Sequence, residues 1–365
     1  MGFNCGIVGL PNVGKSTLFN ALTETAAAAA ANFPFCTIEP NMGRVPVPDP
    51  RLERIAGIAA SAKVTPTQLE FVDIAGLVKG ASTGEGLGNQ FLGHIREVDA
   101  ILQVLRCFED DNVTHVAGAI DPLADVEVIA TELMLADLES LERRTTSLQK
   151  RARGGDKEAK ETLALAERAM AALSSGQPAR SVAVGETEQK AWRGLQLLTA
   201  KPMLYICNVD EGSAAAGNPL SEAVAARAAE EGLGAVMISA QIEAELAALA
   251  DEERLDYLQT LGLSETGLAK VIHAGYGLLD LITFFTAGPK ESRAWTVKRG
   301  AKAPQAAGVI HTDFEKGFIR AETIAYDDYI ALGGEQGARD GGKMRSEGRD
   351  YVVQDGDVLL FRFNV

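Results

Sequence analysis

A glycine-rich stretch near the start of the chain limits the possible folds more than any other feature. Residues 3–8 (FNCGIV) have the composition of a short buried strand, GLPNVGKST follows at once, and TLFNAL then carries apolar residues at helical spacing. Strand, Gly-x-x-x-x-Gly-Lys-Ser and helix, in that order, predict a phosphate-binding loop in an α/β fold with a mostly parallel sheet.

Each residue type in this loop has a chemical role in binding phosphate or metal. Gly14 lets the backbone curl so that successive N–H groups point at phosphate oxygens, and the start of the helix adds its positive dipole end. Lys15 is expected to reach the terminal phosphates, and the Ser16 hydroxyl to bind Mg²⁺. We therefore predict a nucleotide-phosphate site built on the following residues: Asn12, Val13, Gly14, Lys15, Ser16 and Thr17.

A second acidic element supports a nucleotide switch. The apolar run TQLEFVDIAG (67–76) ends in Asp73-x-x-Gly76. An acidic residue at the tip of a neighbouring strand helps to hold the metal, and the Gly76 N–H would sense the γ-phosphate. Thr37 in NFPFCTIEPN is the candidate that completes the Mg²⁺ ligands Ser16 and Asp73, with an ordinary strand threonine as the alternative. The pattern favours the GTPase-like class over a metabolic kinase.

The residue after Gly76 departs from the small-GTPase pattern. Those proteins use a glutamine there to orient the attacking water, and this chain has Leu77, which cannot hydrogen-bond a water. Slow intrinsic hydrolysis is the direct expectation. His115 is the candidate for positioning water; His94, a K⁺ ion near Asn12 or a partner molecule are alternatives, and either histidine could simply be a surface residue.

The base-reading motif also departs from the usual one. GTPases recognise guanine with Asn-Lys-x-Asp after a strand. In YICNVDE (205–211) the asparagine is kept as Asn208, but Val209 stands in place of the lysine and Glu211 in place of the aspartate. Loss of a bidentate carboxylate contact costs about 1–3 kcal/mol of base discrimination, by analogy with base-edge readout in nucleic acids. We expect Asn208, the backbone near Val209 and Ser239 to surround adenine, so that ATP is preferred over GTP.

The middle of the chain reads as a helical insertion. In residues 125–173, apolar side chains recur at spacings of three and four, and Gly154-Gly155 interrupts the pattern. Seven basic and only two acidic residues lie between 143 and 160, on a chain whose formal charge is −15. Either a solvated helix face or a contact with RNA phosphate explains this excess.

The remaining features concern the C-terminal part and the compartment. The last ~80 residues alternate short apolar runs with glycine, as in a small β domain, and Asp355-Gly356 is a hairpin signal. The acidic overall charge argues against wholesale, non-specific nucleic-acid binding and leaves room for a local basic patch; we expect no DNA partner. Four scattered cysteines, no signal peptide and no bilayer-length apolar run favour a reducing, cytoplasmic location away from membranes.

Together these stretches resemble the YchF subfamily of Obg-like P-loop NTPases over essentially the whole chain. The resemblance is carried by GLPNVGKST, NFPFCTIEPN, FVDIAGLVKGAS, GEGLGNQFL, NVDE and HTDFEKGFIRAETI. It implies an ATPase with Mg²⁺, ribosome association, a coiled-coil arm inserted in the nucleotide domain and a C-terminal β-grasp (TGS) domain. It also implies that a hydrophobic residue replaces the catalytic glutamine and that His115 is the favoured catalytic histidine. Gly76 is the second residue that we expect to take part in catalysis.

We accordingly expect a nucleotide-binding domain made of residues 1–127 and 199–280, a helical arm of 128–198 and a TGS-like domain of 281–365. Two other functions stay open at this point. One is a GTP-specific enzyme on the same frame, and the other is a ribosome-binding scaffold whose hydrolysis is incidental.

Overall fold

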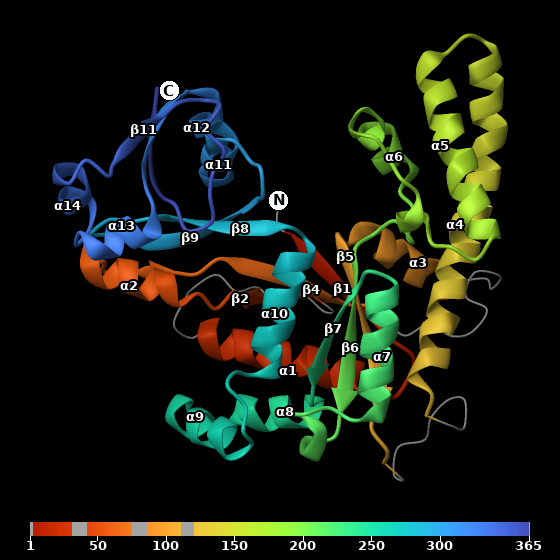
Figure 1. The fold of residues 1–365 in the computed structure, drawn as a ribbon, viewed down its shortest axis with the longest axis horizontal. Coiled ribbons are helices and arrows are strands. Elements are labelled where there is room, and N and C mark those ends of the chain that lie inside the picture. The colour runs from red at the N-terminus through yellow and green to blue at the C-terminus, as the bar shows by residue number, and fades with distance from the viewer. Residues whose placement is uncertain (1–2, 31–41, 75–86, 111–119, 365) are drawn as a thin grey trace.

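The computed structural model describes residues 3–30, 42–74, 87–110 and 120–364. In this part of the chain two six-stranded sheets lie beside each other, and a pair of long helices projects from the first (Figure 1). The three cysteines that are described, Cys5, Cys107 and Cys207, are buried free thiols.

The first sheet has the order β2-β4-β1-β5-β6-β7. All neighbours pair in parallel except β2 and β4. Two adjacent inner strands, β5 and β6, are buried at every position, as expected where helices cover both faces of a parallel sheet. The strand bounds are β1 Asn4–Val8, β2 Met42–Pro46, β4 Gln68–Asp73, β5 Ala100–Cys107, β6 Met203–Val209 and β7 Gly234–Ile238.

Helices cover both faces of this sheet (Figure 1). α1 (Lys15–Ala30) and α10 (Gly267–Leu278) pack on the face that carries Cys5, and α4 and α7 (Pro219–Glu230) pack on the opposite face. α3 (Leu87–Glu97), α8 (Ala240–Ala248) and α9 (Asp251–Thr260) complete this part. Because the parallel strands all end at one edge, the residues that follow β1, β4 and β6 meet there.

The projecting pair is α4 (Pro122–Arg153) and α5 (Lys157–Ser174), followed by the short α6 (Gln189–Leu195). Asp121 caps the start of α4 and Pro122 occupies its first turn, which fixes where the helix begins. The first half of α4 packs on the sheet, and its second half packs on α5 around Leu141, Leu165 and Ala169. Gly155, with φ 93°, makes the turn between the two helices. The predicted helical insertion is therefore confirmed.

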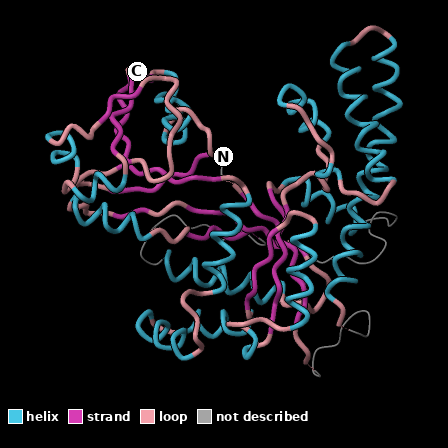
Figure 2. Tube along the Cα trace, in the orientation of Figure 1, coloured by secondary structure: helices cyan, strands magenta, loops and turns pink. Residues whose placement is uncertain are grey.

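The second sheet has the order β11-β10-β12-β8-β9-β3. A hairpin (β8 Leu281–Thr286, β9 Ser292–Lys298) precedes α11 (Ala303–Ile310) and α12 (Thr312–Lys316), and β10 (Phe318–Ile324), β11 (Arg345–Glu347) and β12 (Val358–Phe363) follow. β12 lies parallel to β8 in the middle, and α11 packs against β9 and β10. Figure 2 shows this part of the chain as strands with short helices beside them. This is the β-grasp arrangement that was expected. Two further short helices, α13 (Tyr326–Ala331) and α14 (Glu335–Asp340), lie between β10 and β11.

One segment of the N-terminal half packs with the second sheet. The two-residue β3 (Val64–Thr65) pairs in parallel with β9, and α2 (Pro50–Ala59) places Leu52 and Ile55 in a core with Phe285. Arg51 also forms an ion pair with Asp355, 2.7 Å apart. Residues 50–65 are thus physically part of the C-terminal layer, a feature that the boundaries expected from the sequence did not include.

Candidate functional site

The glycine-rich loop has the backbone needed to surround phosphate. It leaves β1 after Val8 and enters α1 at Lys15, and Asn12 and Gly14 have positive φ angles of 65° and 92°. Within this loop the Asn12 side chain is exposed and Val13 is buried. A loop of this shape directs N–H groups inward, at the positive end of the helix dipole. The predicted phosphate loop therefore has the local conformation that its chemistry requires.

Asn208, at the end of β6, holds this loop to the neighbouring loop. Its side-chain Nδ2 donates to the Val13 carbonyl at 3.0 Å, and its Oδ1 accepts from the Ala240 N–H at 2.9 Å. The side chain is 4% exposed. A Cβ on Gly14 would collide with this amide, so Gly14 is required both by its backbone angle and by Asn208.

Lys15 and Asp73 meet at the carboxyl edge of the sheet. Asp73 is the last residue of β4 and pairs in register with Ile7 of β1, so its carboxylate lies beside the phosphate loop. Lys15 Nζ donates to Asp73 Oδ1, and the two side chains are 11% and 17% exposed. The ion pair brings together two residues that the sequence predicted for one site.

The residues expected near the base have definite partners. Val209 is buried in the sheet core, which leaves only its backbone for a ligand. Ser239 is the N-cap of α8 and accepts from the Ile242 N–H at 3.5 Å. Asp210 accepts from the Ser213 N–H at 3.0 Å and from its hydroxyl at 2.9 Å, whereas Glu211 is exposed.

Several predicted residues lie outside the described part of the chain, namely Thr37, Gly76, Leu77 and His115. His94 is described: it lies on α3 with an exposed side chain. Among the described residues no three His, Cys, Asp or Glu side chains gather as a metal site. The oxygen donors at hand, the Ser16 hydroxyl next to Lys15 and the Asp73 carboxylate paired with Lys15, are of the type that Mg²⁺ prefers, so the residues fit that ion.

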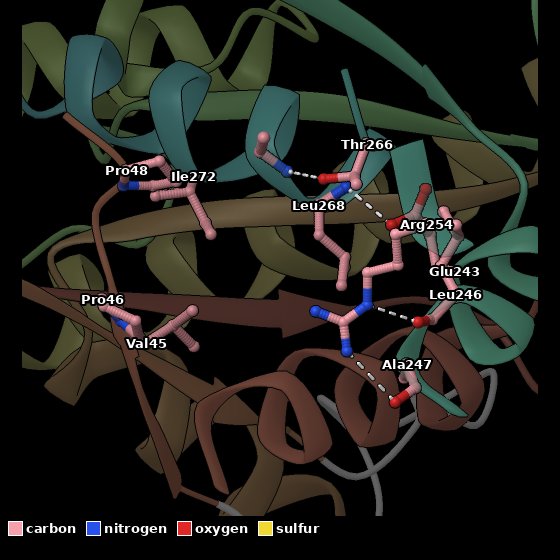
Figure 3. Close-up of a pocket in the computed structure, with 11 residues that line it drawn as sticks. Val45, Pro46, Pro48, Glu243, Leu246, Ala247, Arg254, Thr266, Leu268 and Ile272 are labelled. Atoms are coloured by element: carbon pink, nitrogen blue, oxygen red, sulfur yellow. Dashed lines mark hydrogen bonds between the residues drawn. The ribbon is translucent and has the colours of Figure 1, made fainter. Parts of the chain in front are cut away.

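A separate apolar cavity lies between β2, α8, α9 and α10 (Figure 3). Its volume is about 130 Å³, below the range of about 300–1,000 Å³ typical of ligand pockets. Its charged groups are already used, since Arg254 Nε donates to the Leu246 carbonyl at 2.7 Å and Glu243 accepts from the Gly267 N–H at 2.7 Å. This cavity therefore does not compete with the glycine-rich loop as the functional site.

Glu243 is a residue that sequence reasoning missed. Its carboxylate is 2% exposed and accepts from the first two N–H groups of α10, Gly267 and Leu268. Burial raises the pKa of this carboxyl above its ordinary value, against the effect of these hydrogen bonds. It fixes α8, and with it Ser239 and Ala240, against α10. Nothing in the local sequence AQIEAEL distinguishes this glutamate from a solvent-facing one.

A strand, phosphate loop and helix, an acidic residue on the adjacent strand and an asparagine at the end of β6 define a P-loop NTPase of the GTPase-like class. Residues 4–136 match a family model described as "50S ribosome-binding GTPase". Residues 281–364 match a model for the C-terminal part of YchF GTPases, described as "Protein of unknown function (DUF933)". No helix in the described ranges is long and apolar enough to cross a bilayer.

Full-length relatives identify the family within that class. The chain is 61% identical to the ribosome-binding ATPase YchF of Haemophilus ducreyi, 59% to that of Escherichia coli O157:H7 and 53% to that of Bacillus subtilis, each over 100% of both chains. The solved structure of the Schizosaccharomyces pombe YchF GTPase matches with a TM-score of 0.89 at 38% identity, covering 99% of this chain and 98% of that one. The chain therefore belongs to the YchF family.

Proposed function

We propose that this protein is a magnesium-dependent ATPase that binds ATP in preference to GTP and associates with the ribosome. The relatives that match over their whole length carry the name ribosome-binding ATPase. The structural observation that carries the proposal is the use of polar groups after β6. Guanine recognition needs a free carboxylate at this point, but Asp210 already accepts two hydrogen bonds from Ser213 and Glu211 replaces the usual aspartate.

The other polar groups near the end of β6 can bind adenine. A side-chain amide has two N–H donors, and Asn208 uses one of them on Val13, so the second is free for the N7 acceptor of the base. N7 is common to adenine and guanine, so this contact binds a purine without choosing between them. The preference for ATP then comes from the lost guanine contact, together with backbone near Val209 and the Ser239–Ala240 turn.

The phosphate end works through Lys15. In the structure its ammonium is neutralised by Asp73, and a bound triphosphate supplies stronger negative charge at the same place. We propose that Lys15 leaves Asp73 for the terminal phosphates, which frees the carboxylate. Ser16, Thr37 and Asp73 would hold Mg²⁺, which when bound neutralises the charge that develops on the phosphates.

The hydrolytic residues are proposed from the resemblance to the YchF family. Leu77 cannot orient water, and the resemblance favours His115 for this role, together with the Gly76 N–H, which would sense the γ-phosphate. His94 and a K⁺ ion near Asn12 are the alternatives. Since none of these replaces the glutamine directly, the intrinsic rate is slow.

The same proposal includes the cellular location and the domain boundaries. The protein acts in the cytoplasm, in contact with ribosomal RNA, with the nucleotide domain in residues 1–127 and 199–280, the arm in 128–198 and the TGS-like domain in 281–365. The structure adds that residues 50–65 pack with the last of these.

Hydrolysis assays with purified ribosomes test the function. Phosphate release from ATP and from GTP is measured with and without ribosomes, and co-sedimentation is measured with ATP, with ADP and without nucleotide. The proposal requires faster release from ATP and nucleotide-dependent co-sedimentation. Equal or faster release from GTP, or no association in any nucleotide state, would overturn it.

A further inference from the structure

The far end of the arm carries a charge opposite to that of the rest of the molecule. Residues 143–160 hold seven basic and two acidic side chains, a net +5, so the remaining 28 basic and 48 acidic residues leave −20 elsewhere. Such an asymmetry attracts one end of a molecule to a polyanion and repels the other. We call the turn and the helix ends from Lys150 to Lys160 the arm tip.

The arm tip lies well away from the nucleotide domain (Figure 1). Along α4, the last residue packed in the core of the first sheet is Ala136, and the helix continues to Arg153. At 1.5 Å per residue this places the end of α4 about 25 Å beyond that core. A surface at this distance can contact a large partner while the acidic body stays clear of it.

Four cations at the arm tip have no charged partner among the residues that the structure describes. Asp156 caps α5 through the Ala159 N–H at 3.0 Å and binds the Arg151 guanidinium at 2.7 Å, and the Ala159 hydrogen bond and then Arg151 lower the pKa of its carboxyl. The other exposed cations form no hydrogen bond or ion pair with any residue that the structure describes: Lys150, Arg153, Lys157 and Lys160. A folding role for these four side chains therefore has no contact to support it.

The basic residues nearer the body behave differently. Arg144 donates to the Gly194 and Leu195 carbonyls at 3.1 and 2.8 Å, so it holds α6 against the arm. Arg143 lies 3.8 Å from Glu139 on its own helix. The unpaired charge is thus concentrated at the tip and is not spread along the arm.

We infer that the arm tip binds the phosphate backbone of ribosomal RNA. The inference rests on the proposed ribosome association and names the surface that makes it. No aromatic side chain occurs in residues 143–160, so RNA bases have no ring to stack on there. We therefore expect the contact to be independent of the RNA sequence. Ammonium and guanidinium groups without carboxylate partners fit phosphate, and the acidic body sets the orientation of approach.

Charge substitution tests this contact. The variant Lys150→Glu, Arg153→Glu, Lys157→Glu, Lys160→Glu is compared with a second one that carries Gln at the same positions, in case acidic residues disturb the end of α4. The matched control replaces four exposed cations outside the arm tip with Glu: Arg54, Lys190, Lys290 and Lys316. Circular dichroism and ATP binding establish that each variant is folded.

Binding to protein-free ribosomal RNA is measured as a function of salt. Each phosphate contact contributes a slope of about −0.7 to −0.9 in log K against log salt, so the Gln variant should lower the magnitude of the slope by about 3. At about 50 mM salt its affinity should fall at least about tenfold, and the control variant should lose much less. If the control variant loses as much affinity for the RNA as the tip variants, only the overall charge of the protein matters and the inference is overturned. Wild-type affinity in the tip variants would also overturn it.

Co-sedimentation with intact ribosomes separates the two proposals. If wild type fails to sediment in every nucleotide state, the proposed function fails and the arm-tip contact fails with it. If wild type and tip variants sediment equally, only the arm-tip contact is wrong. If the tip variants no longer sediment with ribosomes but keep their affinity for the isolated RNA, the arm tip binds an acidic ribosomal protein instead. That result also contradicts the phosphate contact.

Discussion

The Asn208 side chain donates to the Val13 carbonyl at 3.0 Å, and so joins the end of β6 to the phosphate loop. The same amide accepts from the Ala240 N–H at 2.9 Å. The base side and the phosphate side of the site are thus connected through one buried residue.

Replacing Asn208 with Ala should weaken the fold and the site together. The Val13 carbonyl and the Ala240 N–H would each lose a buried partner, at about 1–3 kcal/mol for a group left unsatisfied. Urea denaturation should show that loss in the free energy of unfolding, and calorimetry should show weaker binding of ATP and GTP alike. Gln241→Ala, an exposed amide on α8, is the control. Unchanged stability in Asn208→Ala would contradict the bridging role.

Gly14→Ala should abolish nucleotide binding. The position has φ 92°, and a Cβ there would collide with the Asn208 amide, so the loop must leave its phosphate-binding shape. We expect ATP affinity to fall by at least about a hundredfold, since the substitution disturbs several phosphate contacts at once. Gly57→Ala is a matched control, because Gly57 lies in α2 and a Cβ added there would meet open space, so this change should be neutral or stabilising. Near-normal ATP affinity in Gly14→Ala would show that the loop shape is not required.

Lys15→Ala distinguishes a nucleotide switch from a scaffold. The substitution removes the phosphate cation and leaves the Asp73 carboxylate without its ion-pair partner. ATP hydrolysis should be lost, and co-sedimentation with ribosomes should no longer depend on the nucleotide. Ribosome association and a cellular effect that are both unchanged from wild type in this variant would favour the scaffold, whose hydrolysis is incidental.

Glu231 should make stability depend on pH in the acid range. Its carboxylate accepts from Arg227 Nε at 2.6 Å, the Tyr205 hydroxyl at 3.0 Å and Arg180 at 3.1 Å, and it joins α7 to β6 and to the segment after α5. Burial acts to raise the pKa of this carboxyl, but these partners outweigh it and the pKa is lowered from its ordinary 4.5. A lowered folded-state pKa gives stability that is present above 4.5 and is lost as the pH falls through the folded value.

Glu231→Gln should therefore cost stability at pH 7 and progressively less below the ordinary glutamate pKa of 4.5. Thermal or urea unfolding at several pH values measures this, with the neighbouring exposed Glu230→Gln as the control. A cost that is the same at all pH values would mean that the charge of Glu231 does not contribute.

The sequence predicted the parts of the site that depend on local conformation. Gly14, Lys15 and the start of α1 follow from chain geometry within a few residues, and Asp73 follows from the end of an apolar strand. The helical arm was predictable for the same reason, since its apolar spacing and Gly154-Gly155 are local signals.

Contacts between distant segments were not predictable. Asp355-Gly356 gave a hairpin signal, and Gly356 does turn with φ 88°, but β12 then pairs with β10 and β8 and not with the segment just before it. The Asp355 carboxylate instead accepts from the Thr283 N–H at 2.9 Å and binds Arg51. Glu243 and α2 behave similarly, because their partners lie far away in the sequence.

Calorimetric titration of the nucleotide-free protein with ATP and then with GTP, in one magnesium buffer, tests the central claim most directly. We predict tighter binding of ATP, because Asp210 is held by Ser213 and the usual aspartate position carries Glu211, whose side chain is one methylene longer. Tighter binding of GTP would mean that Glu211 reaches the guanine edge, and the proposed ATP preference would be wrong.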